Sequence, residues 1–299
     1  MDLYKESPSL IVFDCQRDQI ALEEFLIEKN ISGRLFRRLY RRKDIYLNGK
    51  FVRKSTMLKK GDRVSIYMED EENNITPERM DLDILYEDYD ILVINKGPDI
   101  VVHPTKSHQE GTLSNGIAHY FKENNIQKKI RFVNRLDMDT TGILIVAKNP
   151  FGHQQMGLQL EKNTVVKKYL CLVEGLVQDD EGTIDLPIGR EEERSIRKVV
   201  TSSGQNALTT YRVRERYKDA TLLEVRIFTG RSHQIRVHMK HMGHPIIGDS
   251  LYNKESPYIK RQALHSYYLK AKHPREEREI EFYAPLPKDM EKLIGILKD

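Results

Sequence analysis

Apolar and polar positions in the first quarter of the chain follow two different periods. From residue 34 to residue 42, apolar residues recur at helical spacing and leave arginines on another face, which predicts an amphipathic helix. Asn48-Gly49 then separates two short apolar pairs, a strong signal for a tight hairpin. Residues 64–68 alternate apolar and polar, as in a half-buried strand. These elements predict a small folded domain over residues 15–68.

Longer elements are predicted beyond residue 79. Short apolar runs have the length of buried strands at residues 91–94, 143–147, 169–173 and 222–227. Residues 151–162 and 232–242 are predicted as helices, the second beginning at the capping residue Ser232 and ending at Gly243. This mixture of strands and helices predicts an α+β domain over residues 79–299.

An acidic, polar segment separates the two domains. Residues 69–78 contain five acidic residues and a proline and show no apolar period. A run of like charges with few apolar residues has little to bury. We therefore expect residues 69–78 to be a flexible linker.

Positive charge is concentrated in the first domain. The chain has a formal net charge of +4, but between residues 31 and 60 eleven lysines and arginines face one acid, Asp44. Such a local excess is typical of a surface that binds a polyanion. The candidate phosphate contacts share one face of the predicted helix and are Arg34, Arg37, Arg38, Arg41 and Arg42. A solvated surface helix is the alternative, and a membrane-surface helix is disfavoured because its apolar residues are needed to hold so small a domain together.

Composition favours a globular protein of a reducing compartment. Hydrophobic residues make up 39% of the chain and charged residues 31%. Cys15 and Cys171 lie far apart and outside any paired motif, so neither a disulfide framework nor a cysteine zinc site is expected. No signal-peptide pattern and no apolar run of membrane-spanning length is present. We expect a cytoplasmic protein without membrane contact.

Reactive chemistry is expected where charged residues stand before a buried strand. Residues 131–142, Arg-Phe-Val-Asn-Arg-Leu-Asp-Met-Asp-Thr-Thr-Gly, put arginines and two carboxylates into a turn ahead of the apolar run 143–147. Unpaired charge is costly to bury, so such a turn holds either an ion-pair network or a reactive carboxylate. Asp139 fits an ordinary turn residue. Asp137 is the candidate reactive group.

This segment and four others, in order along the chain, resemble the motifs of the pseudouridine synthases that modify ribosomal and transfer RNA. Residues 135–137, Arg-Leu-Asp, are similar to the triplet that carries the nucleophile of that family. The domain at 15–68 resembles the RNA-binding domain named after small-subunit ribosomal protein S-four. The other matches are residues 85–88 with 96 and 101–104, 168–169 with 173–175, 229–238 with 243–249, and 261–265.

The resemblance implies a pseudouridine synthase fold, with a mainly antiparallel mixed sheet and flanking helices, and isomerisation of uridine in RNA without a cofactor or a metal. It implies Asp137 as nucleophile and Tyr169 as the residue that stacks on the uracil. Arg231 is the family-equivalent cation beside Asp137, with Arg236 as second choice. The target uridine has to be flipped out of its helix, and Arg135 is expected to fill the vacancy.

Two departures from the family pattern are visible. Asn134, a candidate RNA contact, stands where many members carry histidine, and residues 96–99 are Lys-Gly-Pro-Asp instead of the more usual Lys-Pro-x-Gly order. Neither departure removes a reacting group. They affect local loop geometry and the RNA site that is recognised.

RNA is the expected partner. The alternatives concern which RNA is bound and whether the protein is an enzyme. Large-subunit ribosomal RNA is preferred because a basic N-terminal domain accompanies many family members that act there, and transfer RNA stays open. A monomer is the default expectation. A non-catalytic RNA-binding module is disfavoured by the set Asp137, Tyr169 and Arg231. A metallohydrolase is disfavoured because its candidate ligands lack helical ligand spacing: His233, His238, His241, His244 and Asp249.

Overall fold

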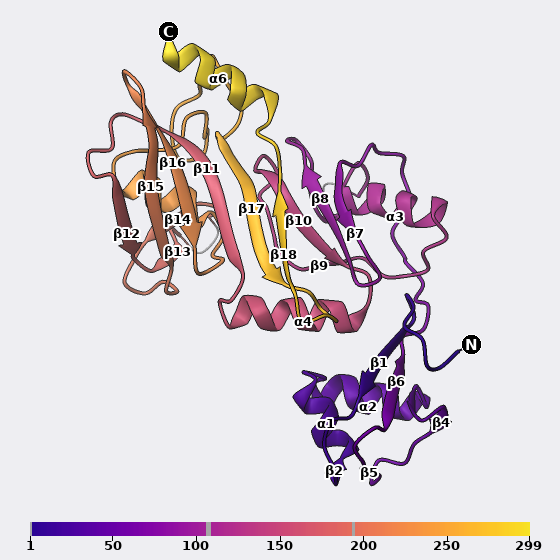
Figure 1. The fold of residues 1–299 in the computed structure, drawn as a ribbon. Coiled ribbons are helices and arrows are strands. Elements are labelled where there is room, and N and C mark those ends of the chain that lie inside the picture. Colours follow the sequence, from indigo (N-terminus) through magenta and orange to yellow (C-terminus); the bar gives the residue numbers. More distant parts are fainter. Residues whose placement is uncertain (1, 106–108, 193–194) are drawn as a thin grey trace.

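The computed structural model describes residues 2–105, 109–192 and 195–299, which form a small N-terminal unit beneath a larger unit (Figure 1). The N-terminal unit has two helices, α1 (Leu22–Glu28) and α2 (Gly33–Arg42). One antiparallel sheet has the order β1-β6-β3-β4, and β2 pairs with β5. The strands are β1 (Leu10–Asp14), β2 (Ile20–Ala21), β3 (Ile45–Leu47), β4 (Lys50–Phe51), β5 (Met57–Leu58) and β6 (Arg63–Tyr67).

Local sequence explains the elements of the N-terminal unit. The Ser32 hydroxyl accepts a hydrogen bond from the backbone N–H of Leu35 at 3.2 Å, which caps α2 at its first turn. At the β3–β4 hairpin, Asn48 and Gly49 both have positive φ, 48° and 80°, as a tight turn with matching twist requires. β1 pairs along the whole of β6, so this sheet takes in residues before 15.

The larger unit is built on a ten-stranded sheet with the path β12-β15-β16-β11-β17-β10-β8-β7, to which β18 and β9 are added at β17 and β10. Every pairing in it is antiparallel except β10 with β17. The predicted α+β class with a mainly antiparallel mixed sheet is thus confirmed. The strands are β7 (Ile84–Glu87), β8 (Ile91–Lys96), β9 (Arg131–Phe132), β10 (Thr141–Ala147), β11 (Val166–Glu174), β12 (Glu181–Asp185), β15 (Leu208–Arg216), β16 (Ala220–Ile227), β17 (Leu264–Lys272) and β18 (Glu279–Tyr283), with a separate pair β13 (Ile188–Arg190) and β14 (Lys198–Val200).

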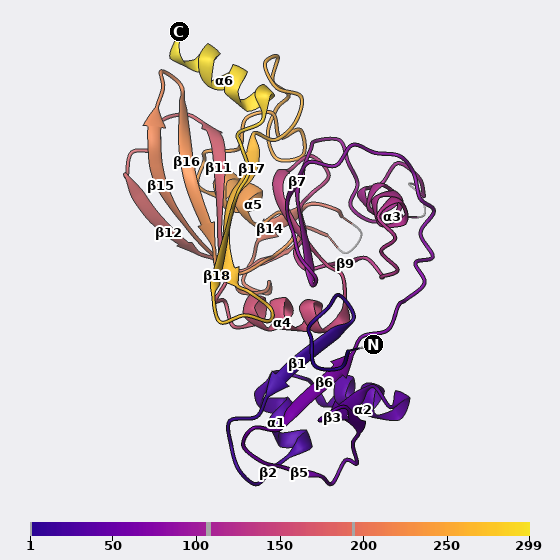
Figure 2. The ribbon, with the colours of Figure 1, turned by 45° about the vertical axis from the view of Figure 1, so that its right-hand side comes forward.

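Helices cover both faces of this sheet (Figure 2). β10 is buried along its whole length, and its side chains alternate between two hydrophobic clusters. Leu144 and Val146 belong to the cluster that also contains residues of α3 (Leu113–Glu123), α5 (Gln234–His241) and α6 (Lys288–Lys298). Ile143 and Ile145 face the cluster that contains Met156 of α4 (Pro150–Glu161). The continuous apolar run of the sequence is therefore a two-faced central strand.

The parallel step between β10 and β17 requires glycine at one position. Gly142 has φ of 111° and pairs with Ser266. A Cβ atom at this position would lie 2.1 Å from the carbonyl oxygen of Ser266. No other residue can adopt this backbone angle and this close approach without strain. Gly142 therefore sets the junction at which the two halves of the sheet meet.

The two units are docked against each other. Phe151 of α4 is 2% exposed and belongs to the hydrophobic cluster of the N-terminal unit, with its ring centroid 6.0 Å from that of Phe13. Arg275 donates to the carboxylate of Asp90, which is fully buried, and to the carbonyls of Ser7 and Leu10. An arginine so placed joins the N-terminal strand to the ten-stranded sheet through a buried ion pair.

The expectation that residues 69–78 form a flexible linker is wrong for the first part of this segment. Arg131 donates to both carboxylate oxygens of Glu71 at 2.7 Å, and Lys128 donates to the carbonyls of Met68 and Glu69. The acidic residues are thus held by basic partners that lie about 60 residues further along the chain, which local composition does not reveal.

Two further observations concern the helices. The sequence predicts that the helix over 232–242 begins at Ser232, but α5 begins at Gln234, because His233 has a left-handed backbone with φ of 56° and gives no side-chain cap.

In the part of the chain that the structure describes, no helix has both the length and the apolar character that crossing a membrane would require.

Gly142→Ala tests the close approach at the parallel step. The added methyl group meets backbone that cannot move aside, so we expect the free energy of unfolding to fall by more than about 3 kcal/mol in denaturant titrations. Gly157→Ala in α4 is the control, because a Cβ there meets nothing within 4 Å and alanine favours a helix. A small effect at Gly142 would mean that the junction tolerates a side chain.

Candidate active site

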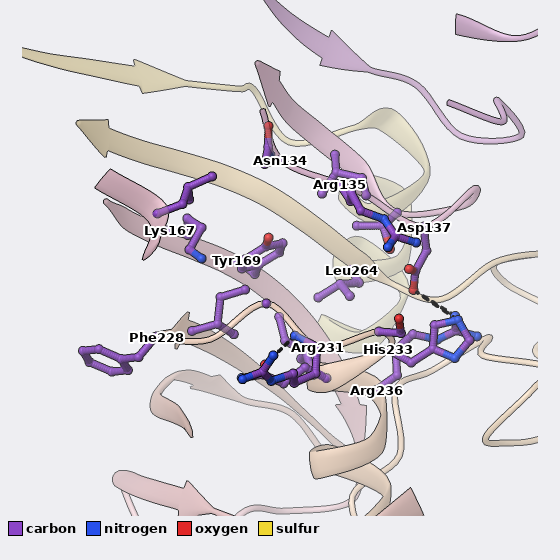
Figure 3. A pocket seen from close by; sticks show the side chains of 18 of the residues that line it. Asn134, Arg135, Asp137, Lys167, Tyr169, Phe228, Arg231, His233, Arg236 and Leu264 are labelled. Carbon is purple, nitrogen blue, oxygen red and sulfur yellow. Dashed lines mark hydrogen bonds and ion pairs between the residues drawn. The ribbon is translucent and has the colours of Figure 1, made fainter. Parts of the chain in front are cut away.

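The largest concentration of predicted site residues surrounds a cavity of about 280 Å³ at the parallel step of the sheet. Its walls are the segment 133–137 before β10, Lys167 and Tyr169 of β11, the end of β16, and the segment 230–236 that leads into α5. Figure 3 shows Tyr169 and Asp137 projecting into the space between these elements. Segments far apart in the sequence thus meet at one pocket.

Asp137 lies at this pocket with its side chain 30% exposed and is paired with Arg236. The Nη1 group of Arg236 donates to Asp137 Oδ2 at 3.0 Å. The other edge of the same guanidinium donates through Nε and Nη2 to both oxygens of Asp249, at 2.7 and 2.8 Å. One arginine therefore bridges a buried carboxylate and the candidate nucleophile.

The arginine is fixed by its surroundings before any substrate arrives. Asp249 is fully buried, and its Oδ1 also accepts from the backbone N–H groups of Leu251 and Tyr252 at 3.2 Å. Burial alone would lower the pKa of Arg236, but the hydrogen bonds and charge of Asp249, and then the charge of Asp137, hold that pKa well above its usual value. Arg236 stays protonated and places a positive charge 3.0 Å from the carboxylate of Asp137.

The prediction that Arg231 pairs with Asp137 is wrong. Arg231 Nε donates to the carbonyl of Asn206 at 2.9 Å, and Nη1 donates to Gln205 Oε1 at 3.1 Å. Arg231 lines the pocket apart from Asp137 (Figure 3). Its backbone N–H is held by the side chain of Gln234 in the turn before α5, whereas Arg236, the second choice, lies on the inward face of the helix.

Tyr169 is 6% exposed and forms part of the pocket wall. Burial raises the pKa of its phenol to about 12, a hydrogen bond with Ser266 opposes the rise, and the charge of Asp137 adds to it. The phenol is therefore neutral at physiological pH. A neutral ring in this position can stack on a planar base, and its hydroxyl is a weak base.

His233 is a pocket residue that sequence reasoning considered only as a metal ligand. Its Nδ1 is 2.8 Å from the hydroxyl of Tyr252, and its Nε2 is 3.9 Å from Asp137 Oδ2. Burial lowers the pKa of His233, although the charge of Asp137 opposes this. Positive φ in a non-glycine residue beside a pocket is a signal of function that no sequence pattern carries.

Lys167 also lines the pocket and is not among the residues that the sequence predicted. Burial lowers the pKa of its amine. Lys167 and Tyr169 are two positions apart on β11, and side chains two apart on a strand lie on the same face. The predicted strand over residues 169–173 begins too late to include this lysine, whereas β11 begins at Val166.

Asn134 and Arg135 stand in different environments at the pocket edge. The amide of Asn134 donates to the carbonyl of Ile143 at 3.0 Å and accepts from the N–H of Ile145 at 2.8 Å. The nitrogen and the oxygen of the Asn134 amide both bind β10 and attach the loop to it, contrary to the expectation of an RNA contact. Arg135 is exposed and lines the pocket.

A buried lysine, Lys96, holds the turn that follows Asp137. Lys96 is 1% exposed and donates to the carbonyls of Gly97, Ile100 and Met138. Burial lowers its pKa to about 8, with the charge of Asp139 opposing the change. Lys96 therefore positions the loop that carries Asp137.

The arginines of α2 do not line this pocket. Four of them face a separate groove, while Arg42 makes ion pairs with Asp44, at 3.2 Å, and with Glu69. Arg42 is thus engaged within the protein, contrary to its expected role as a phosphate contact.

The histidines that suggested a metal site have other partners. His238 contacts the hydroxyl of Thr209 and the carbonyl of Leu186, and His244 contacts the carbonyl of Glu174. Over residues 2–105, 109–192 and 195–299, no group of three or more His, Cys, Asp or Glu side chains is placed to hold a metal ion. The geometry gives no support to a metallohydrolase.

Comparison with known proteins identifies relatives over most of the chain. Residues 90–241 match the profile of a family described as RNA pseudouridylate synthase. A Bacillus subtilis protein described as an uncharacterized RNA pseudouridine synthase, YlyB, is 44% identical over 259 residues, 85% of this chain and 86% of its own. Ribosomal large subunit pseudouridine synthase D of Haemophilus influenzae is 36% identical, covering 80% of this chain and 78% of its own.

A solved structure shows the same arrangement. Human RNA pseudouridylate synthase domain containing 1 is 27% identical and superposes with a TM-score of 0.59, covering 73% of this chain and 95% of that one.

Arg236→Met and Arg231→Met form a matched pair that tests the two arginine assignments. Loss of Arg236 leaves a carboxylate buried without a cation, so we expect the free energy of unfolding at neutral pH to fall by about 3–5 kcal/mol. Loss of Arg231, whose partners are neutral, should cost less than about 1 kcal/mol. Equal effects of the two substitutions would contradict the assignment.

Proposed function

The chain belongs to the RNA pseudouridylate synthase family and isomerises uridine in RNA to pseudouridine; from this we propose that its target lies in large-subunit ribosomal RNA and that Asp137 is the nucleophile. The observation that carries the proposal is the ion-pair bridge of Asp137, Arg236 and Asp249 at a pocket that also contains Tyr169. The relative named as a large-subunit ribosomal enzyme supports the choice of RNA.

The chemistry requires few groups. The bond from ribose C1′ to N1 of the base breaks, the base turns, and C5 bonds to C1′ while the C5 proton leaves and N1 gains a proton. The composition of the RNA is unchanged. Asp137 can begin the reaction by attacking C1′ or by removing the neighbouring C2′ proton. In either route the hydrogen bond from Arg236 holds the carboxylate of Asp137 in position beside the ribose.

The remaining pocket residues are assigned by their environment. Tyr169, with a pKa of about 12, would stack as a neutral ring on the flipped uracil. Arg135, which is exposed and lines the pocket, would occupy the space that the uridine leaves in its helix. A monomer is proposed as the acting form.

The N-terminal unit is proposed as an S-four-like RNA-binding domain. Its support is the row of exposed arginines on α2 and the order of helix, hairpin and strand. Residues 79–299 are proposed as the catalytic domain, because every residue of the pocket lies beyond residue 130.

Asp137→Asn tests the nucleophile. The substitution keeps the size of the side chain and removes its charge, so pseudouridine formation should fall below detection while affinity for RNA changes little. Asp139→Asn, in the same turn, should retain most of the activity. Formation of pseudouridine can be followed by tritium release from C5-labelled uridine. Activity of Asp137→Asn within tenfold of the wild-type protein would reject Asp137 as the nucleophile.

Mapping of pseudouridines identifies the substrate RNA. RNA from strains with and without this protein is labelled with carbodiimide and read by primer extension. We expect one or more stops in large-subunit ribosomal RNA to disappear when the protein is absent. Loss confined to transfer RNA would overturn the choice of substrate and leave the isomerase activity intact.

A further inference from the structure

We propose that the groove between α2 and α4 binds the phosphate backbone of the same RNA whose uridine enters the active-site pocket, so that both units hold one substrate. The inference rests on the proposed function, since it assumes an RNA substrate. It goes beyond that function by placing the contact between the units, with α4 of the catalytic unit as one wall.

The groove is a defined space of about 720 Å³. Figures 1 and 2 show the N-terminal unit, which carries α2, placed beneath α4. One wall presents Arg34, Arg37, Arg38 and Arg41 of α2. The opposite wall includes residues 153–154, 157–158 and 161 of α4. Neither unit forms this space by itself.

The charge of the groove is strongly positive. All four arginines are exposed, and in the described ranges none of them has a carboxylate partner within ion-pair distance, in contrast to Arg42 on the same helix. Glu161 is the one acidic residue among the described residues that line the groove. Like charges three and four residues apart destabilise a helix unless an anion lies between them. The unpaired row is therefore suited to a polyanion.

The spacing of the arginines fits a nucleic-acid backbone. Residues 34, 37, 38 and 41 lie on one face of α2, and seven residues of helix extend over about 10 Å. Successive nucleotides of a helical strand advance about 3 Å along its axis. The row therefore spans about three nucleotide steps, and contacts of this kind recognise the backbone without reading the bases.

The walls of the groove are held in place. Gln155 of α4 donates to the carbonyl of Lys29 at 3.0 Å, and the Ser32 hydroxyl donates to Gln154 Oε1 at 2.9 Å. Phe151 is buried in the core of the N-terminal unit, and Arg275 holds β1 through Asp90. These contacts hold the walls of the groove together in the free protein. Little conformational entropy is then lost when RNA binds, which favours affinity.

The groove leads to the active site. In α4, Gly157 and Glu161 line the groove, whereas Leu160 lines the active-site pocket. Arg131 likewise lines the groove and Asp137 the pocket, and six residues of extended chain span at most about 20 Å. The groove and the active-site pocket therefore adjoin along α4 and along the segment that leads to Asp137.

Gly157 offers a direct test, because a side chain added there enters open space. Gly157→Glu puts a negative charge opposite the arginines, and Gly157→Gln adds a side chain of the same size without charge. With a structured fragment of large-subunit ribosomal RNA, we expect Gly157→Glu to weaken binding at least tenfold at low salt. The slope of log affinity against log salt should become flatter by about 0.7–0.9 for each phosphate that the variant no longer binds. Gly157→Gln should bind within threefold of the wild-type protein.

A second pair of variants separates a local contact from general electrostatics. Arg37→Gln with Arg41→Gln removes two charges from the groove, and Lys50→Gln with Lys54→Gln removes two charges elsewhere in the same unit. The groove pair should flatten the salt dependence more than the other pair. Equal effects of the two pairs, or equal binding by Gly157→Glu and Gly157→Gln, would overturn the proposal.

The failure of the proposal can be distinguished from failure of the proposed function. Single-turnover formation of pseudouridine by the wild-type protein on this fragment tests the proposed function, and the affinity of Gly157→Glu for the same fragment tests the groove. Absence of pseudouridine with the wild-type protein on this fragment would reject the proposed substrate. Pseudouridine formation by the wild-type protein, together with unchanged RNA affinity of Gly157→Glu, would reject the groove proposal and leave the proposed function intact.

Discussion

The active site depends on one buried ion pair, that of Arg236 with Asp249. A carboxylate with no exposure is unfavourable unless a cation neutralises it, and Arg236 does so through two parallel hydrogen bonds. These bonds leave Nη1 directed at Asp137. The position of the Asp137 carboxylate is therefore determined by an arginine that a fully buried carboxylate, Asp249, holds in place. Because the guanidinium is planar, any rotation that would improve one of these contacts would break the other.

Gly142 explains why the site lies at the parallel step of the sheet. Antiparallel strands on either side approach the junction of β10 and β17, and Gly142 allows them to meet closely. The loop before β10 is then held by Lys96 and Asn134, and β11 brings Tyr169 beside it. Several rigid elements thus fix the groups around Asp137, which is the condition for electrostatic preorganisation.

Features that depend on neighbouring residues were predictable from the sequence, and features that depend on distant ones were not. The strand around residues 143–147 and the hairpin at Asn48-Gly49 follow from local apolar pattern and backbone preference. Spacing could not choose between Arg231 and Arg236, since the choice depends on the left-handed backbone of His233, which delays the start of α5. The pairing of Glu71 with Arg131 joins residues 60 apart and turns an apparent linker into an attached segment.

Attachment of the N-terminal unit has a consequence for catalysis. Flipping a uridine out of a stacked helix costs a few kcal/mol, and this energy has to come from contacts with parts of the RNA that do not react. A domain on a flexible tether would raise the local concentration of RNA without orienting it. A unit fixed through Phe151 and Arg275 instead holds its arginines at a defined distance from Asp137. Contacts of such a unit with the RNA backbone can restrain the RNA helix while the uridine rotates out of it into the pocket. Binding energy from contacts far from the reacting atoms can then offset the cost of flipping the base.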